Sequence, residues 1–195
     1  MDYVYIAMVD TPGLLADMIR KATGNNYIHV VISMDEGFEH AYSFGRRNPQ
    51  IPIIAGFEQE ETDRILHKFP TARYRITRIP CEPHKKEAMM AQLQEMYRER
   101  YTYHYCVAGL FAVLFQKPLH QRNFYTCSSF AARLLEQQGM QLFDKDYSLV
   151  TPDDFYHLEQ LECIYEGYFR DYAKEHCTRG HYARNHHLIG VAYES

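Results

Sequence analysis

The sequence predicts one α+β domain, and three observations lead to that prediction. Strand-like runs rich in β-branched residues and helix-like runs with apolar residues at helical spacing both occur along the chain. The 195 residues are 46% hydrophobic and 24% charged, which is ordinary for a folded globular protein. No internal repeat, low-complexity segment or long linker divides the chain, so residues 1–195 are expected to form a single domain.

The N-terminal part predicts a strand, a helix and a hairpin. Residues Tyr3–Val9 alternate and are rich in strand formers. A threonine–proline pair at 11–12 is typical of a helix start, and the amphipathic pattern after it ends near Gly24. The β-branched run Tyr27–Met34 predicts a strand with one histidine inside it. Turn residues follow, and Phe38–Phe44 is expected to return as the second arm of a hairpin.

The middle of the chain predicts a loop, two helices and a strand. Gly45–Pro52 is basic and contains proline, which favours a loop. Glu58–His67 has acidic residues in its first turn and predicts a short helix. Arg73–Ile79 alternates as a strand does, and Pro83–Arg100 predicts a charged helix with an apolar inner face. The apolar run Val107–Phe115 is expected to be buried, whatever its secondary structure.

The C-terminal part predicts two helices and a strand. Cys127–Gln138 has clear helical spacing, and Gly139 is a typical residue to end that helix. Further on, Pro152–Glu159 predicts a short helix and Ile164–Phe169 a strand, followed by a polar tail.

Charge and hydropathy exclude several classes of protein. Lys and Arg number 21 against 25 Asp and Glu, a net charge of −4, which argues against a general nucleic-acid binder. The longest apolar run, Cys106–Phe115, is far shorter than the ~20 residues of a membrane span. The N-terminus has an acid at position 2 and no Lys or Arg before its apolar run, unlike a secretory signal or a transit peptide. The chain is therefore expected to be cytoplasmic.

Cys127 is the first candidate for chemistry. Thr126 is a good N-cap, which places Cys127 in the first turn of the predicted helix. Apolar residues lie three, four, seven and eight positions after the cysteine, so its side chain is on the inward face of the helix. The helix N-terminus lowers the pKa of a thiol and offers N–H groups to an oxyanion. The alternative is a buried structural cysteine.

His29 is the candidate base. It lies inside the β-branched run, where a polar ring needs a partner if it is buried. A core histidine with satisfied hydrogen bonds is the alternative interpretation. Taken together, a cysteine at a helix N-terminus and a histidine on a strand are the two parts of papain-type catalysis.

These segments resemble the papain-like fold of the NlpC-type cell-wall peptidases in its circularly permuted form. That form occurs in YiiX-like amidases and in relatives of lecithin:retinol acyltransferase, and it places the histidine strand before the cysteine helix, as here. The resemblance covers roughly residues 3–140. The segments that carry it are Ala22-Thr-Gly24, Tyr27-Ile-His-Val-Val-Ile32, Tyr42-Ser-Phe-Gly-Arg46, Ala55-Gly-Phe57, Tyr101-Thr-Tyr103 and Phe124-Tyr-Thr-Cys-Ser-Ser-Phe130. It implies an antiparallel sheet packed against the helix that carries the cysteine.

The family also implies a third polar residue, on the strand after the histidine, which orients the ring. A two-residue turn in the hairpin puts His40 on the face of His29. A three-residue turn with a bulge pairs His29 with Ser43 instead and brings Glu39 opposite Ser33. We expect His40 to be the third residue, with Ser43 and Glu39 as the alternatives.

Neither a metal nor an organic cofactor is expected. The five cysteines are widely spaced and form no CxxC pair. The histidine-rich C-terminal end has spacings that fit no closed zinc pattern. Its potential ligands are His176, Cys177, His181, His186 and His187. We interpret this end as a polar tail.

The sequence therefore predicts a cysteine hydrolase that cleaves an amide bond, peptide or N-acyl, through an acyl-enzyme. Cys127 is expected to be the nucleophile, His29 its base and His40 the orienting residue. The resemblance implies a small peptide, N-acyl or lipid-like substrate. Three alternatives remain: a thiol acyltransferase or lipid esterase, a non-catalytic ligand-binding member of the same fold, and a structural or interaction protein whose tyrosine-rich surface docks a partner.

Overall fold

A computed structural model of the chain describes residues 1–12, 27–46 and 55–177. The strands are β1 (Asp2–Asp10), β2 (His29–Ser33), β3 (Ala41–Arg46), β4 (Ala55–Gln59), β5 (Arg73–Cys81), β6 (His104–Tyr105), β7 (Phe124–Tyr125) and β8 (Glu162–Tyr168). The α-helices are α2 (Thr62–Lys68), α3 (Pro83–Arg98), α4 (Val107–Leu114), α5 (Cys127–Gln137), α6 (Pro152–Tyr156) and α7 (Phe169–His176). Two 3₁₀ turns, η1 (Arg100–Thr102) and η2 (Tyr147–Leu149), complete the described elements.

One sheet of eight strands organises the described part of the chain, in the order β7-β6-β4-β3-β2-β1-β5-β8. Neighbouring strands are antiparallel except β6 and β7, which pair in parallel. The α+β class predicted from the sequence is therefore confirmed.

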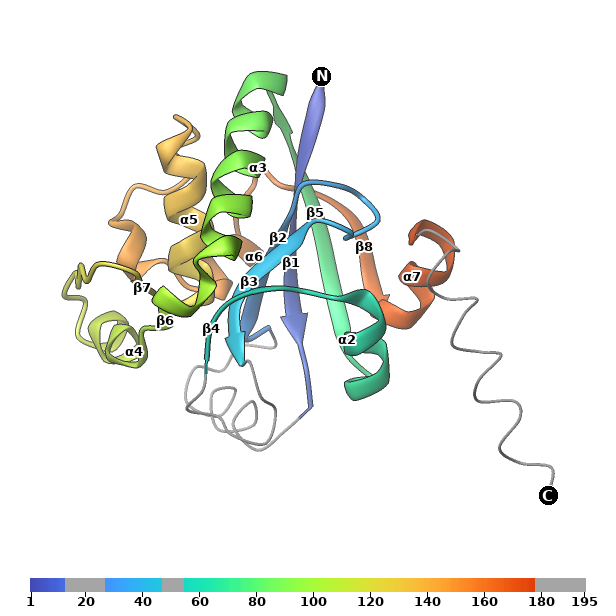
Figure 1. The fold of residues 1–195 in the computed structure, drawn as a ribbon, viewed down its shortest axis with the longest axis horizontal. Coiled ribbons are helices and arrows are strands. Elements are labelled where there is room, and N and C mark those ends of the chain that lie inside the picture. Colours follow the sequence, from blue (N-terminus) through green and yellow to red (C-terminus); the bar gives the residue numbers. More distant parts are fainter. Residues whose placement is uncertain (13–26, 47–54, 178–195) are drawn as a thin grey trace.

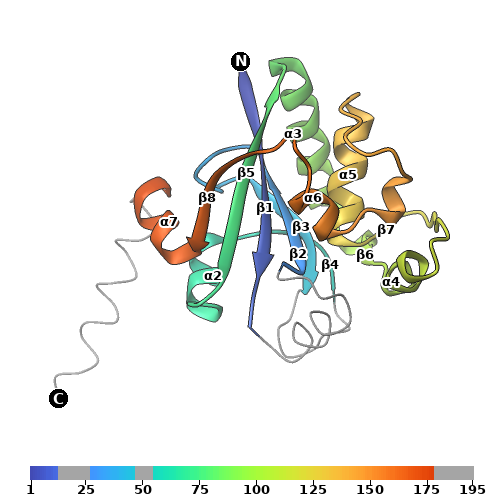
Figure 2. The ribbon, with the colours of Figure 1, turned by 180° about the vertical axis from the view of Figure 1, so that it is seen from behind.

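Helices cover both faces of the sheet (Figures 1 and 2). Alternate residues of β1 are buried in two different cores: Ile6 and Met8 lie in the larger one, Ala7 and Val9 in the smaller one. The larger core is closed by α3, α5 and α6, and the smaller one by α2 and α7. Because both faces are covered, the central strands are apolar on both sides.

Most of the predicted elements are present, with some shifts of boundaries. The strands expected from Tyr3, Tyr27 and Arg73 are β1, β2 and β5. The expected helix over 58–67 was wrong in its first part, because Ala55–Gln59 pairs with β3 and β6 as strand β4, and α2 begins only at Thr62. The helix expected after residue 11 and most of the basic loop over 45–52 lie outside the described residues.

The turn of the β2–β3 hairpin is longer than either expected turn. Ser33 pairs with Ala41, a register that neither alternative predicted. The carboxylate of Asp35 accepts hydrogen bonds from the backbone N–H groups of Glu39 and His40, at 2.8 and 2.7 Å. A side chain that satisfies two backbone donors stabilises a wide turn, which strand alternation does not reveal.

Two expectations about the second half of the chain were wrong. The run Val107–Phe115 was expected to be buried, but five of its large side chains are exposed, four on α4 and one at its C-cap, Phe115. The segment after the last strand was expected to be a polar tail, but Phe169–His176 forms α7. This helix packs through Phe169 and Tyr172, both almost fully buried, against the smaller core.

Phe44 connects the sheet to the cysteine helix. Its ring lies 5.5 Å from that of Phe57, 5.3 Å from Tyr125 and 5.1 Å from Phe130 of α5, and the side chain is fully buried. We expect Phe44→Ala to lower the free energy of unfolding by about 3–5 kcal/mol, because it removes buried area and leaves a cavity. Urea denaturation followed by circular dichroism measures the loss. Phe111→Ala, on an exposed ring, is the matched control and is expected to change stability by less than about 1 kcal/mol.

Candidate active site

Cys127 is the first residue of α5, as the sequence predicts. Thr126 caps the helix: its hydroxyl accepts from the N–H of Ser129, whose own hydroxyl accepts from the N–H of Thr126. The Cys127 side chain is 4% exposed and lies at the edge of the larger core. The N–H groups of a first helical turn have no acceptor within the helix, so they are available to a negative charge at this point.

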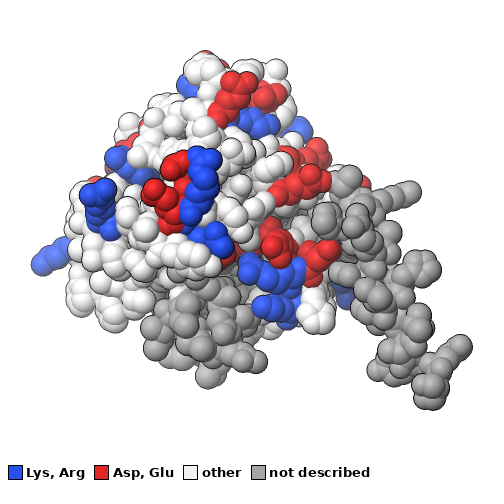
Figure 3. Space-filling model, viewed as in Figure 1, with Lys and Arg blue, Asp and Glu red and all other residues white. Residues whose placement is uncertain are grey.

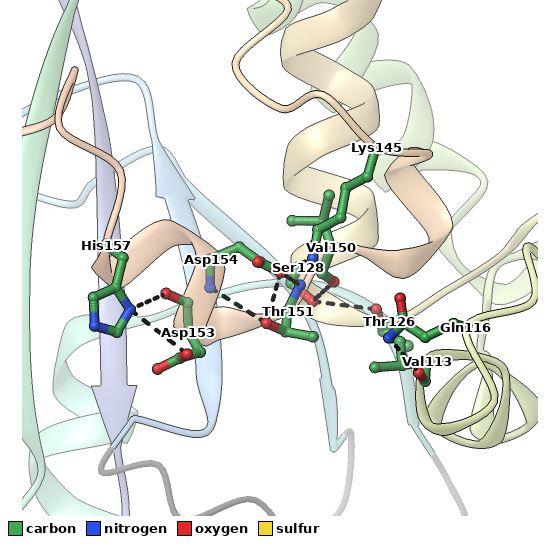
Figure 4. Close-up of polar contacts among 10 residues, drawn as sticks. All are labelled: Val113, Gln116, Thr126, Ser128, Lys145, Val150, Thr151, Asp153, Asp154 and His157. Carbon is green, nitrogen blue, oxygen red and sulfur yellow. Dashed lines mark hydrogen bonds and ion pairs between the residues drawn. The ribbon is translucent and has the colours of Figure 1, made fainter.

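The start of α5 is tied to the segment that leads into α6 (Figure 4). The Ser128 hydroxyl donates to the carbonyl of Val150 at 2.6 Å. Immediately afterwards, Thr151 and Asp154 form the capping box of α6, and Lys145 pairs with Asp154 at 2.7 Å. These bonds fix the residue next to the cysteine, so the position of the thiol does not depend on α5 alone.

His29 is the first residue of β2, next to Val9 of β1, and its side chain is 23% exposed. On the other side lies Gly45 of β3, where an added Cβ would be 3.5 Å from the ring carbon Cε1 of His29. The same point is 3.4 Å from the Ser43 hydroxyl and 3.7 Å from the Glu60 carboxylate. The missing side chain of Gly45 thus leaves space in which these three polar groups meet.

Ser43 and Glu60 form a relay to the ring. Nε2 of His29 lies 3.2 Å from the Ser43 hydroxyl and 3.7 Å from Oε1 of Glu60. Ser43 donates its single hydroxyl proton to Oε1 of Glu60 at 2.5 Å, so it accepts from Nε2–H. This assigns the proton to Nε2 and leaves Nδ1 as the other nitrogen of the neutral ring. Arg64 lies 3.8 Å from the second Glu60 oxygen.

His29 and Cys127 shift each other's pKa in opposite directions. Burial alone lowers the pKa of His29, but the charge of Cys127, the hydrogen bond to it and the Glu60 carboxylate outweigh burial and raise this pKa to about 10. Burial alone raises the pKa of the Cys127 thiol. The His29 cation, the hydrogen bond with it, and backbone N–H groups of Val30 and Ser128 together hold this pKa below its ordinary range. The two groups therefore favour a thiolate–imidazolium pair.

The structure does not bring His40 to His29. The His40 ring is 46% exposed, and its Nδ1 lies 3.1 Å from Asp35 in the hairpin turn. His29 is at the opposite end of β2, which at ~3.3 Å per residue puts the two histidines roughly 16 Å apart. The observed register, in which Ser33 pairs with Ala41, also removes the shared face on which the expectation of His40 depended. Glu39 is exposed in the same turn, so of the three candidates only Ser43 reaches His29.

Two residues of the site were missed by the sequence analysis. Glu60, whose side chain is 15% exposed, was assigned to the start of a helix, but it continues β4 and donates its N–H to the carbonyl of Ala41. The period-2 pattern of a third antiparallel strand would have placed it on the face of Ser43. Tyr105 of β6 is the other: burial and the charge of the nearby Cys127 raise the pKa of its hydroxyl.

The described residues contain no group of three or more His, Cys, Asp or Glu side chains that could hold a metal ion. Of the histidine-rich end, His181, His186 and His187 lie outside the described residues. His176 stacks on Tyr172, and Cys177 donates to the carbonyl of Gly37 at 3.1 Å. Among the helices that the structure describes, none has both the length and the apolar character to cross a membrane.

Comparison of the chain with protein-family models, with curated proteins and with solved structures finds no match. Any assignment of function must therefore start from the geometry around Cys127 and His29.

Proposed function

We propose that the protein is a cysteine-dependent hydrolase that cleaves an amide bond, in a small peptide or an N-acyl compound, through an acyl-enzyme. The observation that carries the proposal is a cysteine at the first turn of α5 and a histidine held by Ser43, which act on each other so that the thiol pKa is lowered and the histidine pKa raised. A buried structural cysteine is expected to have a raised thiol pKa, because burial disfavours the thiolate. A lowered pKa therefore points to a chemical role. Perturbed pairs of this kind are concentrated at catalytic sites.

In the proposed reaction, the Cys127 thiolate attacks the carbonyl carbon of the substrate and forms a tetrahedral intermediate. The N–H of Cys127, at the positive end of α5, stabilises the oxyanion. The His29 imidazolium then donates its proton to the leaving amine, and the C–N bond breaks to give a thioester on Cys127. Neutral His29 next takes a proton from water, which attacks the thioester. The C–S bond then breaks, which releases the acid product and restores the thiolate–imidazolium pair.

Ser43 and Glu60 are proposed as positioning residues. The Ser43 hydroxyl accepts from Nε2–H, so Nδ1 is the nitrogen that serves the thiol. The negative charge of Glu60 favours the imidazolium form. This division of roles resembles that of a triad, in which the third residue orients the ring and stabilises its cation without itself taking up the proton.

We expect Glu60→Gln to lower kcat by at least about tenfold and to shift the alkaline limb of the kcat/KM profile to lower pH. The direction follows because loss of the carboxylate charge removes a cause that raises the pKa of His29. Ser43→Ala is expected to act in the same direction with a smaller effect. The measurement is hydrolysis of a panel of chromogenic acyl amides across pH.

Glu39→Gln is the matched control, with the same change of side chain on an exposed turn. His40→Ala tests the residue predicted from the hairpin pattern, and both variants are expected to keep wild-type kcat within about twofold. An unshifted alkaline limb in both Glu60→Gln and Ser43→Ala would exclude the proposed relay.

A further inference from the structure

Helix α4 presents an apolar stripe to solvent. Val107, Leu110, Phe111, Leu114 and Phe115 recur at the spacing of one helix face and are between 44% and 73% exposed. An amphipathic helix of a soluble domain normally turns such a stripe inward. A contiguous exposed apolar surface marks a site that contacts another molecule or a membrane.

The exposed position of α4 is fixed by contacts at both of its ends. At the start, Cys106 donates its N–H to the carbonyl of Tyr125 at 2.9 Å. Gly109 is buried against Thr126, where an added Cβ would lie only 3.1 Å from the threonine methyl group. After the helix, the N–H of Leu119 donates to the Ser148 hydroxyl at 3.2 Å. The stripe is therefore held away from the core by the fold, although burial would favour the opposite orientation.

His120 strengthens the contact between the segment after α4 and η2, which the hydrogen bond from Leu119 to Ser148 begins. Its Nε2 lies 2.9 Å from Asp146, and its ring stacks on Tyr147 at 5.3 Å between centroids. The segment that follows α4 is thus joined to η2 by side chains as well as by backbone.

The charged side chains of the segment that carries α4 are all basic, and Asp146, which faces this segment from the start of η2, is paired with His120. From Arg100 to Leu135 the sequence contains no Asp or Glu, although the whole chain has 25 of them. Lys117 and Arg122, just beyond the helix, are exposed, and neither forms an ion pair within the described part of the chain. In Figure 3 the surface at the lower left, where Figure 1 places α4, shows no acidic side chain, and a basic side chain projects at its left edge. An apolar stripe beside unpaired cations is complementary to an anionic lipid surface.

We infer that α4 and the segment to Arg122 dock the protein on an anionic bilayer. The helix has eight residues, about 12 Å at 1.5 Å per residue, so it lies in the interface and does not span the ~30 Å hydrocarbon layer. Its apolar stripe enters the boundary between headgroups and acyl chains, while Lys117 and Arg122 contact lipid phosphates. Since the chain as a whole is acidic, the other faces are repelled and the orientation is defined.

A second copy of the chain fits this surface less well. A two-fold symmetric interface places the same patch of both protomers face to face. Lys117 and Arg122 would then face cations of the partner, without an acidic residue from Arg100 to Leu135 to compensate them.

Docking by this surface brings the candidate active site to the membrane. The residue that α4 packs against, Thr126, directly precedes Cys127. Tyr105, two residues before α4, is near enough to Cys127 for the charge of the thiolate to raise the pKa of its hydroxyl. If the proposed hydrolase activity holds, which this step assumes, the substrate class is an acyl amide or ester whose acyl chain resides in the bilayer. The docking itself does not depend on catalysis.

The test is co-sedimentation of the full chain with vesicles of phosphatidylcholine, with and without phosphatidylglycerol. We expect binding to the anionic vesicles that weakens with salt, and a loss of at least about tenfold in apparent affinity for Leu114→Ser/Phe115→Ser. Lys117→Glu is expected to weaken binding to anionic vesicles in particular. Tyr168→Ser and Lys68→Glu are matched controls on exposed residues of β8 and α2, and both are expected to bind as the wild type does.

Each other outcome overturns the inference. Absence of binding to anionic vesicles, or binding that the α4 variants leave unchanged, excludes α4 as a membrane surface. A dimer in analytical ultracentrifugation that Leu114→Ser/Phe115→Ser dissociates, without vesicle binding, assigns the stripe to a second copy. Cys127→Ala is expected to bind vesicles normally, which separates a failure of docking from a failure of the proposed chemistry.

Discussion

Cys127→Ala is expected to abolish hydrolysis of every acyl amide that the wild-type protein cleaves, a loss in kcat of at least about 1000-fold. His29→Ala is expected to cost nearly as much, because the thiolate loses the cation and hydrogen bond that hold its pKa down. The double variant is expected to lose little more than either single variant, since the two residues act as one unit. Steady-state kinetics on the panel of chromogenic amides measures all three effects.

The fold is the control for this experiment. Alanine is a good helix former and sits on the buried side of α5, so Cys127→Ala is expected to retain the circular dichroism spectrum of the wild type. Retention of wild-type turnover by Cys127→Ala, on a substrate confirmed by product analysis, would show that the thiol is not the nucleophile.

Alkylation of Cys127 by iodoacetamide is expected to remain fast at pH values well below the ordinary thiol pKa of about 9. The sign follows from the lowered pKa: the thiolate persists as the pH falls, until the pH drops through that pKa. At the other limit, kcat/KM is expected to decline as the pH rises through the His29 pKa of about 10, because the general acid is lost. In His29→Ala, the onset of alkylation is expected to move to higher pH. Burial raises the pKa of the Cys127 thiol, and the variant lacks the His29 cation that lowers it.

Peptide mass spectrometry distinguishes Cys127 from the other four thiols, all of which are free. Cys163, exposed on β8, serves as the internal reference for an accessible cysteine. Identical pH profiles of Cys127 in the wild type and in His29→Ala would contradict an ion pair between the two side chains.

The local parts of the site follow from the sequence. Thr126 before an amphipathic run predicts where α5 begins, because capping and helical spacing are properties of adjacent residues. A β-branched run predicts the strand that carries His29 for the same reason. The α+β class also follows, since it needs only the presence of both kinds of element.

The orienting residues depend on pairings between strands. The prediction of His40 failed because Asp35 widens the hairpin turn, and because His40 lies at the end of the hairpin remote from His29. Ser43 reaches the ring through the register of β2 and β3, and Glu60 through the extension of β4. A register shift of one residue exchanges the faces of a strand, so no local pattern could select among these residues.

The sequence by itself determined the class of fold, the start of the cysteine helix and the strand of the histidine, because each depends on interactions between near neighbours in the chain. Only the tertiary structure decided that Glu60 joins Ser43 behind His29, and that the most apolar run of the chain lies on the surface as α4. Hydrophobicity measures the tendency of a segment to leave water, but not which surface covers it. Strand register and the packing of Gly109 on Thr126 supply that information, and both join residues distant in sequence.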